Sequence, residues 1–170
     1  VNEYNPYTTE RFGKGEGDLY VDFLTKTLKP FIDKHYRTLS SKENTIIAGS
    51  SLGGLIAYYA MLKYPDVYGK AGIFSPAFWV ATPSINHLTD SVGNKVSGKI
   101  FFYMGEQEGG DDLKLMNDIK ENIATRSSAM IYCVTDSEGK HNEQAWRKWF
   151  AEFYKWIMAE GFNTILKPEE

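Results

Sequence analysis

Short apolar runs alternate with longer amphipathic segments along this chain. Runs of strand length, each bounded by turn residues, occupy positions 45–49, 71–75, 99–104 and 129–134. Buried strands of a parallel sheet read as continuous apolar runs, whereas half-exposed strands alternate apolar and polar residues. We therefore predict strands at these positions, buried in a mostly parallel sheet.

The segments between the runs have helical spacing. Helices are predicted from Asp18, as N-cap, to about Tyr36, and over 55–64, 113–126 and 141–161. Pro30 should kink or divide the first of them. Residues 1–17 read as an irregular loop, and 76–98 as a long connection with one helical turn near 84–88. Alternating strands and helices predict an α/β fold with right-handed crossovers, forming a single domain over 1–170.

The last predicted helix carries an apolar stripe that should face the core. Its members share one helical face: Trp146, Trp149, Phe150, Phe153 and Ile157. Residues 163–170 should form a loosely held tail, and Cys133 should be a buried strand residue.

Composition narrows the classes of partner. Hydrophobic residues make up 42% of the chain and charged residues 24%, which is ordinary for a globular protein. The net charge is -3 and no basic stripe is present, so we expect no nucleic-acid partner. No apolar run approaches the roughly 20 residues that span a bilayer, so no membrane partner is expected either. We expect no metal and no cofactor, because no His/Cys pairing or EF-hand loop occurs. The single cysteine leaves the compartment undetermined.

One motif carries candidate chemistry. Residues 49–53, Gly-Ser-Ser-Leu-Gly, fit the G-x-S-x-G nucleophile elbow with Ser51 at its centre. Centring the pattern on Ser50 fails, because Ala48 and Leu52 would then occupy the glycine positions. An apolar strand precedes the motif and an apolar helix follows it, as the elbow requires. We therefore predict that Ser51 is a nucleophile, that the Leu52 N–H stabilises an oxyanion, and that crowding excludes a Cβ from both glycines.

A serine nucleophile needs a base, and His141 is the best-placed histidine. The alternatives are His35, on a polar helix face, and His87, in the long connection. His141 follows the fourth strand, and in an open α/β sheet chemistry gathers at the carboxyl ends of the strands. We predict that His141 accepts the serine proton.

The acid that orients the histidine should lie between the serine and the histidine in sequence. Spacing alone does not choose among Glu106, Glu108, Asp111, Asp112 and Asp136. The pair Asp111 and Asp112 also precedes a predicted helix and would serve equally well as a helix cap.

Four ordered motifs resemble the esterase family related to enterochelin esterase and S-formylglutathione hydrolase. They occupy 47–54 around the elbow, 74–79 (Phe-Ser-Pro-Ala-Phe-Trp), 105–108 (Gly-Glu-Gln-Glu) and 139–146 (Gly-Lys-His-Asn-Glu-Gln-Ala-Trp). The resemblance implies a three-layer α/β-hydrolase sandwich and ester hydrolysis. It carries the acid role to Glu108 and the base role to His141. It also places Trp79 and Phe78 near the substrate pocket.

The chain departs from that family before the elbow. Family members carry several strands ahead of the segment that opens this chain, and nothing before residue 45 here reads as a strand. We therefore expect a truncated sheet with the elbow strand at its edge. Such an edge needs cover from a partner subunit in a homo-oligomer, an N-terminal fragment, or the loop 1–17. The second oxyanion donor has no visible source.

These observations predict a serine hydrolase of small-molecule carboxylic esters that works through an acyl-enzyme intermediate. Ser51 attacks, His141 relays the proton and Glu108 holds His141. The alternatives are an acyltransferase on the same triad and a non-catalytic binding module that keeps the fold. The identity of the ester is left open.

Overall fold

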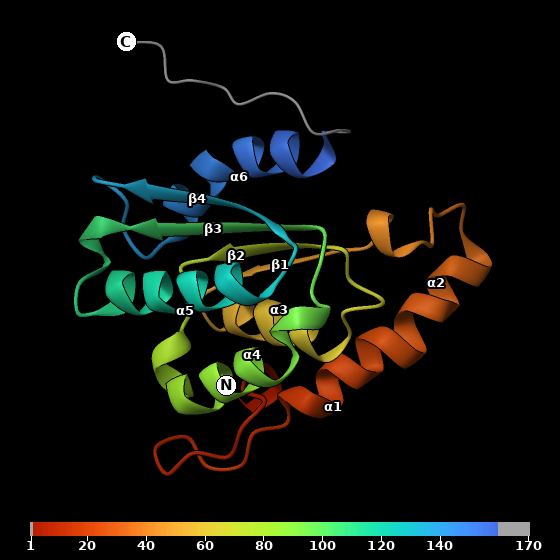
Figure 1. Ribbon diagram of the computed structural model, residues 1–170, viewed down its shortest axis with the longest axis horizontal. Coiled ribbons are helices and arrows are strands. Elements are labelled where there is room, and N and C mark those ends of the chain that lie inside the picture. The colour runs from red at the N-terminus through yellow and green to blue at the C-terminus, as the bar shows by residue number, and fades with distance from the viewer. Residues whose placement is uncertain (1, 160–170) are drawn as a thin grey trace.

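The computed structural model describes residues 2–159 (Figure 1). Its sheet has four parallel strands in the order β1-β2-β3-β4. The strands are β1 (Ile46–Ser50), β2 (Lys70–Phe74), β3 (Lys99–Gly105) and β4 (Met130–Asp136). The predicted strands and the α/β class are thus confirmed, with strand ends shifted by at most two residues. The predicted tail 163–170 lies outside the described residues.

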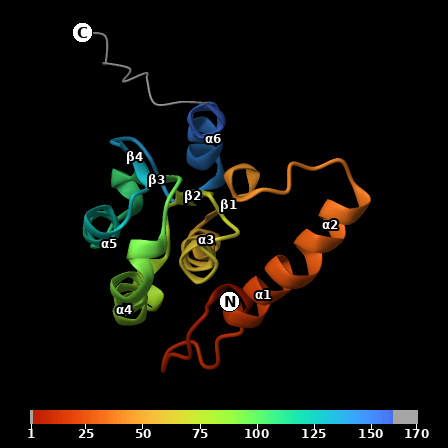
Figure 2. The ribbon, with the colours of Figure 1, turned by 45° about the vertical axis from the view of Figure 1, so that its right-hand side comes forward.

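Helices cover both faces of the sheet (Figure 2). They are α1 (Gly17–Asp22), α2 (Lys29–His35), α3 (Leu52–Lys63), α4 (Thr82–Val92), α5 (Asp112–Arg126) and α6 (Glu143–Met158). Helices α3 and α5 pack on one face with α4 outside them, and α6 packs on the other face. Within residues 2–159, no helix is both long and apolar enough to cross a bilayer.

Alternation along β3 divides the core into two parts. Ile100 and Phe102 join the cluster under α3 and α5, whereas Phe101 and Tyr103 join the cluster under α6. Every one of these four side chains is fully buried. The predicted apolar stripe of α6 is confirmed in part, because Phe153 and Ile157 are buried in the second cluster, whereas Phe150 is 52% exposed.

The N-terminal helical segment differs from its prediction at its start. Glu16, not Asp18, occupies the N-cap of α1. The Asp18 carboxylate instead accepts hydrogen bonds from Lys63 and Tyr59 of α3, and Lys63 also bonds Asp22. The hydrogen bond from Lys63, then that from Tyr59, lowers the pKa of Asp18. Asp18 therefore joins α1 to α3 and does not cap the helix as predicted.

Pro30 lies where the hydrogen-bond pattern of this segment changes, but the helix does not break there, so the predicted division is not seen. A π-helical stretch, η2 (Phe23–Leu28), connects α1 to α2, and Pro30 lies in the first turn of α2. The Lys29 N–H bonds the Leu24 carbonyl, five residues back, so the helical backbone passes from η2 into α2 while Pro30 itself has no N–H to donate.

The connection predicted over 76–98 is more helical than expected, and the single turn predicted near 84–88 lies within a longer helix. This connection contains a 3₁₀ turn, η4 (Phe78–Val80), followed by the eleven-residue helix α4. Ile85 and Thr89 of α4 are fully buried, and the Thr89 hydroxyl lies 3.0 Å from the Tyr58 hydroxyl. Leu88 and Val92 also pack against the core, but the Pro, Ser, Asn and Thr residues of this stretch favoured a loop in the sequence pattern. Cys133, predicted to be buried, is half-buried in β4.

Strand β1 is at one edge of the sheet. Within residues 2–159, no strand pairs with its outer side. The loop before α1 forms its only backbone bridge internally, between Thr9 and Gly13, and its first turn packs on α3. This loop therefore does not pair with β1, and the edge is open within the described part of the chain.

Candidate active site

Ser51 stands in a strained turn between β1 and α3. Its backbone has φ 58° and ψ -123°, a region that side-chain-bearing residues rarely occupy. The Ser51 N–H donates to the Phe74 carbonyl at 3.0 Å, which ties the turn to the end of β2. The Ser51 carbonyl accepts from the N–H groups of Gly54, Leu55 and Ala77. Hydrogen bonds to the end of β2, to α3 and to Ala77 therefore hold the Ser51 backbone in this strained conformation. Strained residues held in this way cluster at functional sites.

The two glycines of the elbow have different roles. A Cβ on Gly49 would lie 2.4 Å from the Gly53 carbonyl oxygen and 2.5 Å from its carbonyl carbon. A Cβ on Gly53 would meet nothing within 4 Å. The prediction that crowding excludes a Cβ from both positions is therefore right for Gly49 and wrong for Gly53. Gly53 contributes the backbone against which Gly49 packs.

This asymmetry gives a matched pair of variants. Gly49→Ala should lower the free energy of unfolding by about 1–3 kcal/mol, because the added methyl meets backbone that cannot rotate away. Gly53→Ala should leave the unfolding free energy unchanged or slightly higher, since alanine favours a helix over glycine. Urea denaturation of both variants measures the difference. Equal destabilisation would contradict the packing described here.

The Leu52 N–H begins α3 directly after the candidate nucleophile. Among residues 2–159, it has no hydrogen-bond acceptor. The partial positive charge of a helix N-terminus favours an anion at this place. The geometry is therefore compatible with the predicted oxyanion role of Leu52.

His141 and Glu108 meet at the carboxyl ends of β3 and β4. Glu108 ends the short turn η6 (Glu106–Glu108) that follows β3, and His141 lies in the loop after β4. His141 Nδ1 is 2.6 Å from Glu108 Oε2. The Glu108 side chain is 2% exposed and that of His141 is 42% exposed. An ionised carboxylate only accepts hydrogen bonds, so the matching neutral tautomer of His141 has its proton on Nδ1 and Nε2 as the acceptor.

A helix cap next to His141 and a ring contact hold His141 in place. The predicted start of the last helix at His141 is wrong by two residues, because the Asn142 side chain accepts the Ala145 N–H and caps α6. His141 therefore lies just before the helix. Its ring also packs edge-on against the Trp146 indole, with 5.1 Å between the ring centroids.

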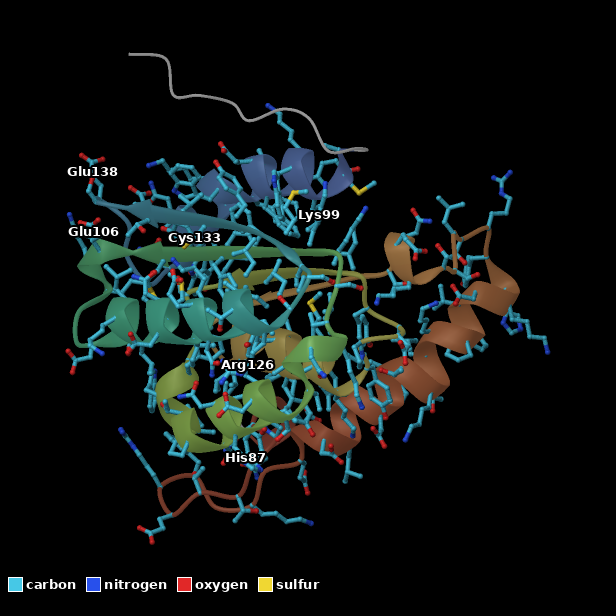
Figure 3. The ribbon with its side chains drawn as sticks, viewed as in Figure 1. His87, Lys99, Glu106, Arg126, Cys133 and Glu138 are labelled. Atoms are coloured by element: carbon cyan, nitrogen blue, oxygen red, sulfur yellow. The ribbon has the colours of Figure 1, made fainter. Side chains whose placement is uncertain are left out.

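The other candidate acids have different surroundings. Glu106 is exposed beside the end of β3 (Figure 3). Asp136 is buried and accepts hydrogen bonds from Trp149 and Lys148, which lower its pKa. Asp111 occupies the N-cap of α5 without a side-chain hydrogen bond, and burial raises the pKa of Asp112. Among the carboxylates of residues 2–159, only Glu108 bonds His141.

The remaining histidines lie elsewhere. His35 is exposed on α2, with Nδ1 2.7 Å from the Phe31 carbonyl oxygen. His87 is exposed on α4, in the outer helical layer (Figure 3). Neither is hydrogen-bonded to a carboxylate within the described residues.

Ser51 and His141 are not hydrogen-bonded to each other among the contacts of residues 2–159. Catalytic hydrogen bonds of this kind are commonly long before substrate binds and tighten in the reactive complex. A groove of about 440 Å³ opens beside Ser51 and is lined by residues of β1, α3 and the N-terminal segment.

The two predicted pocket residues lie in contrasting places. Trp79 is 45% exposed and packs against Phe12, with Arg11 above its ring at 5.3 Å. Phe78 is fully buried and packs edge-on against Tyr58. Phe78 has no exposed surface here, so the structure lends no support to its predicted substrate contact, which stays a prediction.

Sequence reasoning missed the role of Ser75. The sequence predicts Ser75 as the last residue of a strand, whereas the structure places Ser75 just after β2 with φ 41°. Its hydroxyl donates to Glu108 Oε1 at 2.6 Å and accepts from Trp146 Nε1 at 2.8 Å. A positive φ at a serine leaves no mark in the sequence, so no pattern could have revealed this contact. Within residues 2–159, no group of three or more His, Cys, Asp or Glu side chains could hold a metal ion.

Known proteins with similar sequences or folds point to one family. Residues 2–157 match the family described as Putative esterase. The uncharacterized protein YbbA of Bacillus subtilis is 24% identical over 182 residues, which cover 97% of this chain and 72% of that protein.

Two solved structures show the fold. The BES protein from Bacillus cereus has a TM-score of 0.80 at 17% identity, over 94% of this chain and 63% of that one. Enterochelin esterase from Shigella flexneri has a TM-score of 0.67 at 19% identity, over 81% of this chain and 36% of that one. The chain thus spans less than two thirds of either solved protein. Since the family match extends over nearly all of its residues, the chain belongs to the Putative esterase family.

Proposed function

We propose that the protein is a serine hydrolase of carboxylic esters, with Ser51, His141 and Glu108 as its triad. Membership of the Putative esterase family supports ester hydrolysis. The observation that carries the finer assignment is the hydrogen bond between His141 Nδ1 and the buried Glu108 carboxylate. It leaves His141 Nε2 as the free nitrogen, and His141 lies at the carboxyl ends of the strands, as does the Ser51 elbow.

The proposed reaction has two halves. His141 Nε2 takes the Ser51 proton as Oγ attacks the ester carbonyl, and the Leu52 N–H bonds the resulting oxyanion. Collapse of this intermediate expels the alcohol, which receives the proton from His141, and leaves an acyl group on Ser51. Water then attacks the acyl carbon with His141 again as base. This step releases the acid and restores the Ser51 hydroxyl.

A panel of p-nitrophenyl esters of increasing chain length tests the activity and narrows the substrate. Release of p-nitrophenol with an initial burst would support the acyl-enzyme route. Adding a competing alcohol separates the alternatives, since a transferase would form a new ester in place of free acid. The absence of turnover on every ester would favour a non-catalytic binding module.

The open edge of β1 motivates a second proposal, on partners. We propose that a β-strand from an N-terminal segment outside residues 2–159 pairs with this edge and supplies the second oxyanion donor. Three observations support it. Strand β1 has no outer partner within 2–159, and the half-exposed Phe150 of α6 lines a pocket together with Ala48 and Ser50 of β1. The solved relatives are also longer than this chain.

The 170-residue protein should then be slow by about 10²–10³-fold, because one oxyanion donor is missing. Light scattering at several concentrations should show a monomer, and hydrogen exchange should show rapidly exchanging outer amides in β1. A concentration-dependent dimer with protected β1 amides would assign the edge to a second copy instead. A monomer with unprotected β1 and a kcat typical of enzymes, about 1–10³ s⁻¹, would defeat the proposal.

A further inference from the structure

Ser75 is buried and strained, and the proposed reaction does not use it. Ser75 is 1% exposed and its φ is 41°. Its N–H donates to the Tyr103 carbonyl at 2.7 Å, which extends the pairing of β2 with β3 by one residue. A buried serine at positive φ is an unusual feature, and such outliers persist only where surrounding structure enforces them.

The hydrogen bonds of the Ser75 hydroxyl have only one consistent direction. An indole N–H only donates, so Ser75 Oγ accepts from Trp146 Nε1 at 2.8 Å. The single hydroxyl proton of Ser75 is then directed to Glu108 Oε1 at 2.6 Å. Trp146, on α6, therefore fixes the orientation of a donor that comes from the end of β2.

Glu108 receives a second donor on the same oxygen. The Gly105 N–H, at the end of β3, lies 2.8 Å from Oε1. Two donors from two neighbouring strands thus hold Oε1, and this leaves Oε2 for His141 Nδ1. With Oε1 held in this way, the carboxylate cannot rotate without breaking at least one charge-assisted hydrogen bond.

We infer that Ser75 is a positioning residue that sets the orientation of the Glu108 carboxylate toward His141. This inference rests on the proposed function, because it gives Ser75 a role through the proposed acid. Trp146 assists twice, since its N–H orients the Ser75 hydroxyl and its ring face packs against the His141 ring. Residues that follow β2, end β3 and follow β4 therefore contact one carboxylate, and Trp146 of α6 acts on it through Ser75.

Two substitutions remove the hydroxyl in different backbone contexts. Ser75→Ala keeps the Cβ at positive φ, whereas Ser75→Gly deletes the hydroxyl and also relieves the backbone. Both should lower kcat by about 10- to 100-fold with little change in KM, as expected when a catalytic group is held loosely. Trp146→Phe removes the indole N–H together with part of the ring that packs against His141, and it should lower kcat by a smaller factor.

A spectroscopic readout separates positioning from general stability. The downfield proton resonance of His141 Nδ1 reports its hydrogen bond to Glu108, and it should shift or broaden in both Ser75 variants. Thr82→Ala is a matched control, because the Thr82 hydroxyl donates only to the Phe78 carbonyl of η4. It should leave both kcat and the resonance unchanged.

The outcomes distinguish this inference from the proposed function. If the parent protein hydrolyses esters and both Ser75 variants keep its kcat and its His141 resonance, the positioning role is overturned. If Ser75→Gly alone regains the parental kcat, backbone strain explains the effect and the role of the hydroxyl is overturned. A parent protein that hydrolyses no ester would instead refute the proposed function, and the resonance alone would then decide whether Ser75 orients Glu108.

Discussion

Replacing Ser51 with alanine should lower kcat/KM for ester hydrolysis by a factor on the order of 10⁴ or more. The reason is that Oγ forms the proposed covalent bond to the acyl group, and no other group in the elbow can replace it. The unfolding free energy should be nearly unchanged, because the contacts that hold the turn all involve the backbone of Ser51. Stopped-flow or steady-state assays with a p-nitrophenyl ester measure the loss.

Ser50→Ala is the matched control for this variant. Ser50 is the last residue of β1 and directly precedes the strained turn, so this variant removes the same hydroxyl group one position before Ser51. The esterase activity of Ser50→Ala should stay within a few-fold of that of the parent protein. An inactive Ser50→Ala beside an active Ser51→Ala would show that the elbow is centred on the wrong serine.

Replacing Glu108 with glutamine should lower kcat by a factor that approaches about 10⁴. The Ser75 hydroxyl and the Gly105 N–H both donate to Oε1, so the glutamine carbonyl should take that place. The amide NH₂ would then face His141 Nδ1. A donor there forces Nδ1 to accept and moves the ring proton to Nε2, so His141 could no longer take the Ser51 proton.

Glu106→Gln provides the control on the same turn, because Glu106 is exposed and has no hydrogen bond to His141 within the described residues. The Glu106→Gln variant should lower kcat by less than a few-fold. Asp136→Asn separates a second alternative, since Asp136 is buried against Lys148 and Trp149. A loss in either variant as large as that in Glu108→Gln would move the acid role away from Glu108.

The sequence predicted most of the fold because its strongest signals are local. The strands are continuous apolar runs, and the elbow combines a five-residue motif with a strand and a helix. The missed helix α4 has apolar residues at helical spacing, Ile85, Leu88 and Val92, but the Pro, Ser, Asn and Thr residues around them made the stretch resemble a loop. Asp18 was mistaken for a cap because its partners, Lys63 and Tyr59, are distant in sequence.

The site was less accessible to sequence reasoning than the fold. Spacing left five acids open, and only the family resemblance selected Glu108, which the structure places against His141. Phe78 is buried in the core although its neighbour Trp79 is exposed, a difference that the sequence pattern does not predict. Ser75 was missed because its role depends on a backbone dihedral angle and on two partners from other elements.

The most direct test of the account is covalent labelling with a fluorophosphonate, followed by peptide mapping. This probe reacts with an activated serine and with few other hydroxyls. We predict one label per chain, on Ser51, with a rate that falls sharply in Glu108→Gln and is unchanged in Ser50→Ala. A label on any other serine, or an unlabelled Ser51 in a protein that hydrolyses esters, would contradict the account.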